Sequence, residues 1–578
     1  MRPIVLARDE GRVRVCSPEE FLSWLRAQKD TVAVDTETSG LEWEATVRLV
    51  QFGSWFAGYA ISVTEEPGRE LVQQALRQYP GQLIFHNAPF DIRRLDQIGV
   101  DPDYIWPRAK NTHVMSHVYD PAAPSHKLKD LGRVWLGDDG AAQRELKERI
   151  RKHNLKSKKA SIKWDWGTVP RLVLAPYGIE DTVLTHNLHD YLMERLTSKE
   201  LSVCAREYEV AEAVAQVSYK GMQLDVEYAR GLQTTWGARL DELSTWFTDH
   251  GVENPNANRQ IAAHLIGQGW VPHAFTPSGE VKLDKPVLKS LADDYPLVAN
   301  LLEHKRITKW KAAYVDNCLD QMDSTGRVHA GYNSLGARTG RMSCSNPPLQ
   351  QLPKGGGGEV RRLFIASPGN LICSVDYSAI EMRLAGHFAD DPVIKHQYAN
   401  DIDVYEEMAQ AIGCTRPQAK IASLAALYGS RGKSIARALG VSPGEAVAIV
   451  NNFWDQYPAL SRWAMAMTHK ARGNNHVESR WGRRLAPHAP YAAGNAVIQG
   501  TAAEVMKDGI LRLAEHGLLR HVVAIVHDEV VLDVPEAQAQ EVTDEVSSVL
   551  EDRTFSIPLL AEGAVYGRSW GDGYALAA

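Results

Sequence analysis

The sequence predicts a chain of several domains: an α/β domain first, then a mostly helical region and an α+β part. Its 578 residues are enough for about three or four domains. Short apolar runs typical of strands recur in the first hundred residues and again after residue 370, whereas residues 201–323 carry helical spacing of apolar side chains. The strand-like runs are residues 31–38, 82–85, 371–375 and 521–534.

The composition is that of an ordinary globular protein, with 44% apolar and 23% charged residues. No apolar run approaches the ~20 residues that span a bilayer, and charges interrupt the short apolar run at the N-terminus, so neither a membrane span nor a signal peptide is expected. The six cysteines are scattered without a CxxC pair, which argues against a disulfide framework and a zinc cluster and fits a reducing cytoplasm.

The net charge of −7 taken alone disfavours nucleic acid as a partner. Binding needs only a local basic surface, however, and metal-binding carboxylates also make the sum more negative.

Acidic residues end or follow the two strands of the first domain. Asp35 and Glu37 lie at the end of the strand at 31–38, and alternation puts both side chains on one face. The strand at 82–85 runs into a third acid, Asp91.

A fourth acid, Asp181, lies on a helix predicted from residue 176 to 188. Tyr177 is four residues earlier and shares a face of this helix with it. Four carboxylates on three separate elements are expected to converge only if they share a function. One such function is to hold two cations ~3.5–4 Å apart that clamp a phosphodiester. The alternative is a set of scattered, solvated acids.

Two basic segments can each be interpreted either as an ordinary solvent-exposed surface or as a DNA contact. Residues 144–163 hold nine Lys or Arg and two Glu, which suits a solvated loop, a helix with a charged face, or a basic arm that touches a DNA backbone. The helix at 301–311 has a basic flank and is either a generic surface helix or an arm that grips duplex phosphates. That flank comprises Lys305, Arg306, Lys309 and Lys311.

Asp376 follows the apolar run at 371–375 and precedes helical spacing of Ile380, Leu384 and Phe388. It is therefore expected between a strand and a helix, either as a cation ligand or as a simple N-cap. The run at 521–534 predicts a hairpin whose tip carries His527, Asp528 and Glu529. Asp528 is the partner that favours the cation-site interpretation of Asp376.

A helix that begins after Thr415 separates these two acids. Thr415 and Gln418 form a capping box with Pro417 in the first turn. Side chains four apart form one stripe of two cations, an apolar residue and an aromatic residue, which suits a nucleoside triphosphate; an amphipathic surface helix is the alternative. The stripe is Arg416, Lys420, Leu424 and Tyr428.

The N-terminal motifs resemble the DEDDy class of 3′→5′ exonucleases, which have a ribonuclease H-like fold. The resemblance implies that Asp35, Glu37, Asp91 and Asp181 hold two divalent metals and that Tyr177 orients the attacking water. It also implies that Asn87 and Phe90 contact DNA.

The later motifs resemble family A DNA polymerases. Residues 376–381 are similar to motif A, 416–429 to motif B and 527–529 to motif C, and residues 339–341 and 495–503 add two further matches. The resemblance implies a right-hand polymerase with a helical thumb, an antiparallel-sheet palm and helical fingers. The implied domains are the exonuclease at 1–195, the thumb at 196–325, the palm at 326–400 and 486–578, and the fingers at 401–485.

Residue roles follow from this resemblance. Asp376 and Asp528 are expected to hold two magnesium ions, with Glu529 in support, and Glu381 to act as the steric gate against a ribose 2′-hydroxyl. Lys420 is expected to be the general acid for pyrophosphate departure. The expected nucleotide-binding residues are Arg416, Lys420, Leu424, Tyr428, Glu381 and Tyr377, and the expected DNA contacts are Arg341, Asn495, Gln499 and His527.

The expected function is template-directed DNA synthesis with 3′→5′ proofreading. Primer-template DNA and deoxynucleoside triphosphates are the expected partners, and two Mg²⁺ ions, replaceable by Mn²⁺, are expected in each site. We expect a monomer without a membrane, without a 5′-nuclease domain and with no processivity factor identifiable from the sequence. A phage origin, and hence a bacterial host cytoplasm, is the hypothesis.

Two rival functions remain at this stage. A single-subunit RNA polymerase shares the palm, but Glu381 argues against it because that enzyme needs room for the 2′-hydroxyl. A DNA-binding protein with vestigial catalytic domains is disfavoured because every metal carboxylate is present. The sequence departs from the family pattern at Ala379, where Gln is common, at Leu424, where Phe or Tyr is common, and at Tyr491, where Arg is usual.

Overall fold

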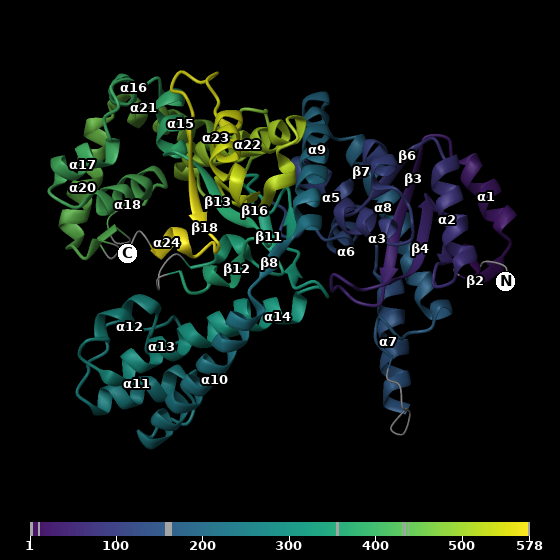
Figure 1. Cartoon of the computed structure of the whole chain (residues 1–578), viewed down its shortest axis with the longest axis horizontal. Coiled ribbons are helices and arrows are strands. Elements are labelled where there is room, and N and C mark those ends of the chain that lie inside the picture. Colours follow the sequence, from purple (N-terminus) through teal and green to yellow (C-terminus); the bar gives the residue numbers. More distant parts are fainter. Residues whose placement is uncertain are drawn as a thin grey trace.

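The computed structural model describes residues 4–9, 12–156, 164–353, 358–430, 432, 435–436 and 439–575. The N-terminal part lies at one end of the molecule and the sheet that carries Asp376 lies near its centre (Figure 1). Residues 157–163 of the predicted basic segment and residues 354–357 lie outside the described residues.

The N-terminal part is built on a seven-stranded sheet in the order β2-β1-β5-β4-β3-β6-β7. Strand β3, next to the central strand β4, is antiparallel to β4 and parallel to β6. The predicted strands at 31–38 and 82–85 are confirmed as β3 and β6. The strands are β1 (Val5–Asp9), β2 (Arg12–Cys16), β3 (Thr31–Thr38), β4 (Val47–Ser54), β5 (Ala57–Ser62), β6 (Gln82–Phe85) and β7 (Ala109–Asn111).

Helix α8 (Arg171–Met193) lies across β3, β4 and β5 and buries apolar side chains against them. It is longer than the helix predicted at 176–188 and contains Pro176 in its second turn. The backbone N–H that Pro176 lacks would have bonded the carbonyl of Leu172, and Leu172 is 60% exposed. The other helices of this part are α1 (Pro18–Ala27), α2 (Glu66–Gln78), α3 (Ala88–Asp96), α4 (Pro102–Ile105), α5 (Thr112–Tyr119), α6 (Leu128–Leu131) and α7 (Ala141–Lys156).

Helix α7 covers the first part of the basic segment and projects away from the sheet (Figure 1). It agrees with the charged-helix alternative. Contact with DNA stays a prediction.

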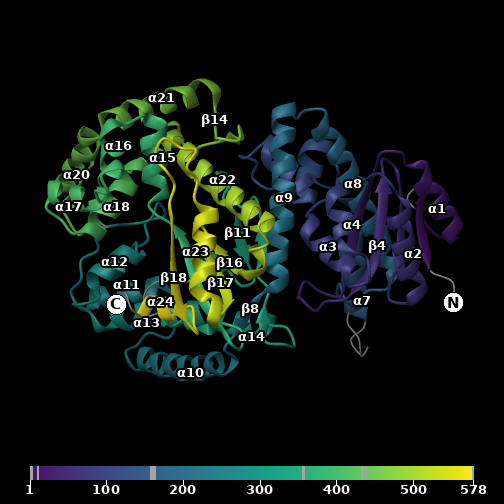
Figure 2. The ribbon, with the colours of Figure 1, turned by 45° about the horizontal axis from the view of Figure 1, so that its top comes forward.

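Helix α9 (Ser198–Lys220) lies between the N-terminal part and the rest of the molecule and connects them (Figure 2). It packs against α5 on one side and against α22 (Ala493–Glu515) on the other. A buried ionic cluster fastens the second contact. Glu207 of α9 accepts hydrogen bonds from Arg483 and, at 2.6 Å, from Lys507 of α22, and all three side chains are at most 2% exposed.

A helical region follows α9, as the pattern at 201–323 predicts, and has its own apolar core. It forms the lower part of the molecule in Figure 1. Within its basic flank, Lys311 pairs with Asp316 at 2.9 Å. Its helices are α10 (Val226–Asp249), α11 (Asn258–Gly267), α12 (Lys285–Leu291), α13 (Pro296–Trp310) and α14 (Asn317–Gln321).

The central sheet has four antiparallel strands in the order β16-β17-β13-β18. The predicted hairpin is confirmed: β16 (Val522–Val526) and β17 (Glu529–Pro535) flank a turn at residues 527–528. Strand β13 (Asn370–Tyr377) pairs with β17 on one side and with β18 (Ala561–Gly567) on the other. Helix α23 (Ala539–Leu550) packs on this sheet and against α22.

Helices inserted between β13 and β16 form the lobe at the upper left of Figure 1. Both predicted capping boxes, at Thr415 with Gln418 and at Ser442 with Glu445, are present. The helices are α15 (Ile380–Ala389), α16 (Pro392–Ala399), α17 (Val404–Ile412), α18 (Arg416–Leu427), α20 (Pro443–Gln456) and α21 (Pro458–Asn474).

The remaining strands are short, and helix α24 (Asp572–Ala575) follows β18. These strands are β8 (Met222–Leu224), β9 (Arg327–Val328), β10 (Gly331–Asn333), β11 (Ser343–Ser345), β12 (Phe364–Ile365), β14 (Val477–Glu478) and β15 (Arg484–Leu485). All six cysteines are free, as predicted. Within the described ranges, no helix combines the length and apolarity that crossing a membrane requires.

Candidate active sites

The central sheet brings Asp376, Asp528 and Glu529 together. Asp376 is one residue from the end of β13 and lies opposite Glu529 of β17. The backbone N–H of Tyr377 donates to the carbonyl of Asp528 at 3.1 Å, which fixes the hairpin tip beside the end of β13. The N-cap of α15 is Ala379 rather than Asp376, so the N-cap interpretation of Asp376 is wrong.

Glu529 is the buried member of this group. It is 5% exposed, and its Oε1 accepts a 2.7 Å hydrogen bond from Ser374 Oγ. Asp376 faces solvent and Asp528 is half-buried. The two aspartates are thus accessible to a ligand, whereas Glu529 is fixed in the protein interior by its hydrogen bond from Ser374.

The hairpin tip has an unusual backbone at His527, whose φ is 62°. This left-handed conformation is uncommon for a residue with a side chain and is maintained by the surrounding structure. His527 and Asp528 line a narrow cavity of about 30 Å³ together with Arg341. Three residues from two predicted motifs therefore share one cleft.

Glu381, on the first turn of α15, is the centre of a hydrogen-bond network. The Tyr428 hydroxyl donates to its two carboxylate oxygens at 2.7 and 3.0 Å, and Arg341 Nη2 donates to Oε1 at 2.6 Å. Gln499 also forms a hydrogen bond with Tyr428. Burial of the Tyr428 hydroxyl raises its pKa to about 12. Four predicted site residues from four separate segments meet here.

The predicted stripe on α18 is present, but its first cation is paired. Arg416 Nε donates to Asp403 Oδ2 at 2.7 Å, although the Arg416 side chain is still 49% exposed. Lys420 Nζ lies 5.7 Å from the centre of the Tyr405 ring. Leu424 is half-buried and packs on the core.

Tyr377 requires a correction. We expected it among the nucleotide-binding residues, but its side chain is 3% exposed and its hydroxyl donates to the Leu550 carbonyl at 2.6 Å. Alternation along β13 explains this, because neighbours of the outward Asp376 must face the core. Asn495, one turn before Gln499 on α22, has a buried Oδ1 without a hydrogen-bond partner in the structure.

The exonuclease-like acids lie at the middle of the N-terminal sheet. Asp91 of α3 is held against β3, because its Oδ1 accepts from Thr36 N at 3.0 Å and from Thr36 Oγ1 at 2.7 Å. Thr36 lies between Asp35 and Glu37, so the hydrogen bonds bring the third acid to the first two. The predicted convergence of these acids agrees with this geometry.

Tyr177 and Asp181 complete the group from α8, together with a residue that the motifs did not include. Lys129 of α6 forms an ion pair with Asp181, and its Nζ is 4.6 Å from the centre of the Tyr177 ring. Burial raises the pKa of Tyr177, and the charges of Glu37 and Asp35 add to this shift.

The electrostatics show that the acids interact with one another. Burial raises the pKa of Asp35 to about 7, against the opposing charge of Lys129. Burial and the Asp35 charge raise the pKa of both Glu37 and Asp91 well above the usual range. Clustered carboxylates with raised pKa values are typical of cation sites, because a bound cation removes the repulsion.

The donor sets fit divalent metals of the magnesium type. Both groups offer carboxylate oxygens, which hard cations such as Mg²⁺ prefer. Within the described ranges, no three His, Cys, Asp or Glu side chains come close enough to enclose an ion as they stand. In the N-terminal group, the positive charge of Lys129 offsets part of the negative charge of Asp35 and Glu37.

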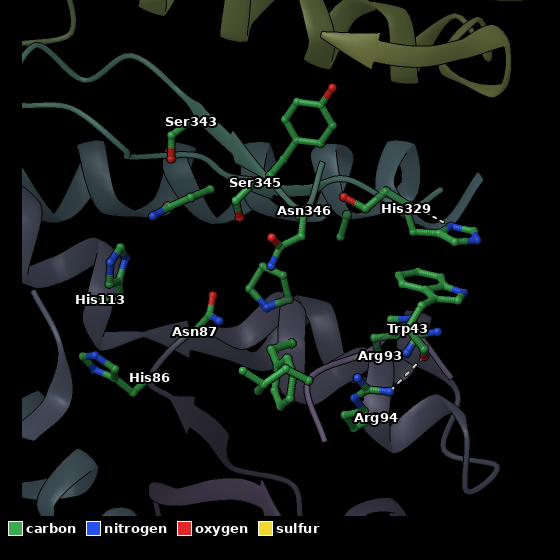
Figure 3. Close-up of a pocket in the computed structure, with 18 of the residues that line it drawn as sticks. Trp43, His86, Asn87, Arg93, Arg94, His113, His329, Ser343, Ser345 and Asn346 are labelled. Atoms are coloured by element: carbon green, nitrogen blue, oxygen red, sulfur yellow. Dashed lines mark hydrogen bonds between the residues drawn. The ribbon is translucent and has the colours of Figure 1, made fainter. Parts of the chain in front are cut away.

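A cavity of about 610 Å³ lies between the N-terminal part and the central part (Figure 3). Asn87 and Phe90 line it on one side, and Ser343 and Asn346 line it on the other. Its described lining contains three cations and no carboxylate, although the chain has a net charge of −7. These cations are Arg93, Arg94 and Lys127.

Aromatic rings and one incompletely bonded cation add to this cavity. Trp43 is stacked on His329 at 3.7 Å, and the Arg93 guanidinium lies 3.2 Å from the Trp43 ring centre. Arg93 Nη1 is buried and has no hydrogen-bond partner in the structure. Cations beside flat rings suit a ligand with phosphates and bases.

Several residues at the two sites were not predicted from the sequence. Glu562 of β18 lies opposite Asp376 and is exposed. An apolar run precedes Glu562, as one precedes Asp376, so the same sequence pattern could have predicted it. Lys129 and Asp403 had no such signal, since each comes into place only through tertiary structure.

The family comparison is decisive. A family model described as DNA polymerase family A matches residues 226–572, and a model described as 3′-5′ exonuclease matches residues 16–197. The chain belongs to DNA polymerase family A. It is thus a DNA-directed DNA polymerase with a 3′→5′ exonuclease domain, and both parts belong to metal-dependent families. The alternative of a single-subunit RNA polymerase is wrong.

Known polymerases are similar over nearly the whole chain. The DNA polymerase of Mycobacterium phage L5 is 30% identical over 580 residues, which cover 96% of this chain and 95% of that protein. DNA polymerase I of Pseudomonas aeruginosa is 27% identical over 608 residues, covering 96% of this chain and 65% of that protein. This family A polymerase also has the fold of a solved structure, the POL domain of Pol1 from M. smegmatis, with a TM-score of 0.78, 22% identity and coverage of 97% of this chain and 99% of that one.

Proposed function

We propose that this family A polymerase extends a primer on a DNA template with deoxynucleoside triphosphates and removes mispaired 3′ ends, using two Mg²⁺ ions in each site. The observation that carries the proposal is the meeting of Glu381, Tyr428 and Arg341 close to the strand ends that carry Asp376 and Asp528. The solved structure with the same fold is a complex with primer-template DNA and dNTP.

In the polymerase site, Asp376 and Asp528 would hold the ions, which supply charge stabilisation for phosphoryl transfer. Arg416 and Lys420 of α18 would bind the incoming triphosphate, and Glu381 would close the space that a 2′-hydroxyl needs. Glu529 keeps the hairpin in place through Ser374. Each role is a proposal drawn from family resemblance and supported by these contacts.

In the exonuclease site, Asp35, Glu37, Asp91 and Asp181 would hold the ions, and Tyr177 would orient the attacking water. The acid-free cavity in Figure 3 supports the proposal that a single-stranded 3′ end enters past Asn87 and Phe90. Its positive charge would attract phosphates, and its rings would stack with bases. The domain boundaries given above and a bacterial host cytoplasm also remain proposals.

One primer-template assay tests both sites. With Mg²⁺ and deoxynucleotides the primer should lengthen, and without nucleotides it should shorten from its 3′ end. Asp376→Ala or Asp528→Ala should reduce synthesis by about 1000-fold or more, because a metal site contributes several kcal/mol, and should leave degradation intact. Asp35→Ala with Glu37→Ala should do the reverse.

The two sets of variants control for each other, since each must retain the activity of the other site. The two-site proposal fails if either set removes both activities from a folded protein. A preference for ribonucleotides would contradict the assignment of Glu381.

A further inference from the structure

Lys129 lies inside the exonuclease cluster although no motif includes it. Its ammonium forms an ion pair with Asp181 and lies 4.6 Å from the centre of the Tyr177 ring. The side chain is 16% exposed and that of Asp181 is 11% exposed. Lys129 therefore touches both residues that α8 contributes to the site.

Packing rather than solvent determines where Lys129 lies. Helix α6, which carries it, packs against α8, and the following π-helix at Gly132–Leu136 does the same. At Gly132 a Cβ atom would come within 2.8 Å of both methyl groups of Leu184. This close approach seats α6 on the helix that carries Tyr177 and Asp181.

If Lys129 had only a structural role, an ion pair with any nearby acid would be sufficient. Its partner is instead Asp181, a proposed metal ligand, and its second contact is with Tyr177, the proposed water-orienting residue. Both contacts fall on members of a single reaction site. An ammonium in that position offsets the repulsion among carboxylates that lie close together.

We propose that Lys129 is a positioning residue of the exonuclease reaction, which holds Asp181 and Tyr177 in place and competes with the divalent cation for Asp181. The inference rests on the exonuclease site described under the proposed function. The substrate concerned is the 3′-terminal phosphodiester of single-stranded DNA.

The proposal requires two effects of opposite direction. Removal of the ammonium frees Asp181, so the cation should bind more tightly. The same change removes a support of Tyr177 and Asp181, so turnover should become slower. A purely structural role would weaken cation binding and turnover together.

The experiment uses the full-length protein with Lys129→Met, Lys129→Arg and the matched control Lys29→Met. Lys29 is exposed and belongs to the same part of the chain. Because the polymerase site is also proposed to hold cations, Mn²⁺ binding in the absence of DNA is measured on each variant combined with Asp376→Ala and Asp528→Ala, from the electron paramagnetic resonance signal of free Mn²⁺. Exonuclease kcat and KM are measured on a single-stranded oligonucleotide with the Lys129 and Lys29 variants alone, and primer extension by these preparations checks folding.

For Lys129→Met we expect kcat to fall by about 10- to 100-fold, the usual effect of losing a residue that orients a metal ligand. KM for the oligonucleotide should change by less than about twofold, and the Mn²⁺ dissociation constant should decrease by about threefold or more. Lys129→Arg, which keeps the charge, should recover part of kcat. Lys29→Met should match the wild type in all measurements.

Two results would overturn the proposal. The first is an unchanged kcat and Mn²⁺ affinity in Lys129→Met, and the second is a joint loss of both. If Lys129→Met does not extend primers, it is not correctly folded and Lys129→Arg is used instead. That variant should show the same two effects, a lower kcat and tighter Mn²⁺ binding, but smaller ones. Nuclease activity that survives Asp35→Ala with Glu37→Ala would show instead that the exonuclease site itself was wrongly assigned.

Discussion

The Tyr428 hydroxyl donates a 2.7 Å hydrogen bond to Glu381 Oε2, which joins the end of α18 to the start of α15. The bond ties the residue proposed to exclude ribose to the helix proposed to deliver the nucleotide. Arg341 holds the same carboxylate from a third segment. The position of Glu381 is therefore set by partners and not by its own backbone alone.

Discrimination against ribonucleotides should depend on these partners. Glu381→Ala should raise the ratio of ribonucleotide to deoxynucleotide kcat/KM by about tenfold or more, and Tyr428→Phe should raise it by a smaller factor, because a hydrogen bond to a charged group is worth about 1.5–3 kcal/mol. Steady-state incorporation of single nucleotides measures the ratio. Tyr104→Phe, far along the chain in the exonuclease part, is the control, and an unchanged ratio in Glu381→Ala would contradict the steric-gate role.

Asp403 should weaken nucleotide binding, because it pairs with Arg416. Asp403→Asn keeps a side-chain oxygen to cap α17, where Asp403 now accepts from Tyr405 N and Glu406 N, but removes the charge. Since exposed ion pairs are worth up to about 1 kcal/mol, KM for deoxynucleotides should fall by about two- to fivefold with little change in kcat. A higher KM in this variant would show that Asp403 orients Arg416 for the triphosphate.

The metal-free exonuclease part should lose stability as pH rises. Burial raises the pKa of Asp35 to about 7 in the folded chain, whereas an unfolded Asp titrates near about 3.9. Between these values the folded state holds a proton that the unfolded state has released, so the contribution of Asp35 to stability is largest below about pH 4 and is lost as pH rises through about 7. Thermal unfolding of chelator-treated protein across this range measures the effect, and Asp35→Asn should flatten it. A stability that rises with pH in the wild type but not in Asp35→Asn would contradict the assignment.

The buried cluster at α9 should contribute strongly to stability. Lys507→Met leaves Glu207 without one of its two cationic partners in a fully buried place, which should cost about 3 kcal/mol. Lys199→Met is the matched control, because Lys199 links α9 to Glu478 through a pair that is 57% and 42% exposed and should cost less than about 1 kcal/mol. Denaturant unfolding followed by fluorescence compares them, and equal midpoints would contradict the importance of burial.

Local pattern was sufficient to predict the elements that carry the chemistry. Strands β3 and β6 and the hairpin around Asp528 were predicted because each is an apolar run with a polar end. Both capping boxes were predicted from four-residue motifs. Such signals lie within a few residues of chain and do not depend on tertiary contacts.

Other features depend on tertiary contacts and had no local signal. The early start of α8 depends on packing across three strands, which overrides the tendency of Pro176 to begin a helix. Lys129 reaches Asp181 across more than fifty residues, and Asp403 reaches Arg416 from another helix. The inward direction of Tyr377 follows from alternation along β13 and could have been predicted once Asp376 was assigned to the open face.

Helix α9 is held on one side by the apolar core that it shares with α5 and α8 and on the other by Glu207, Lys507 and Arg483. Rotation of the exonuclease part relative to α22 would expose these charges without partners, which is costly. The separation of the two catalytic centres is therefore a fixed length of the folded protein. A 3′ end that passes from one centre to the other without leaving the protein therefore has to cover that length through the opening of base pairs, because the protein does not shorten it.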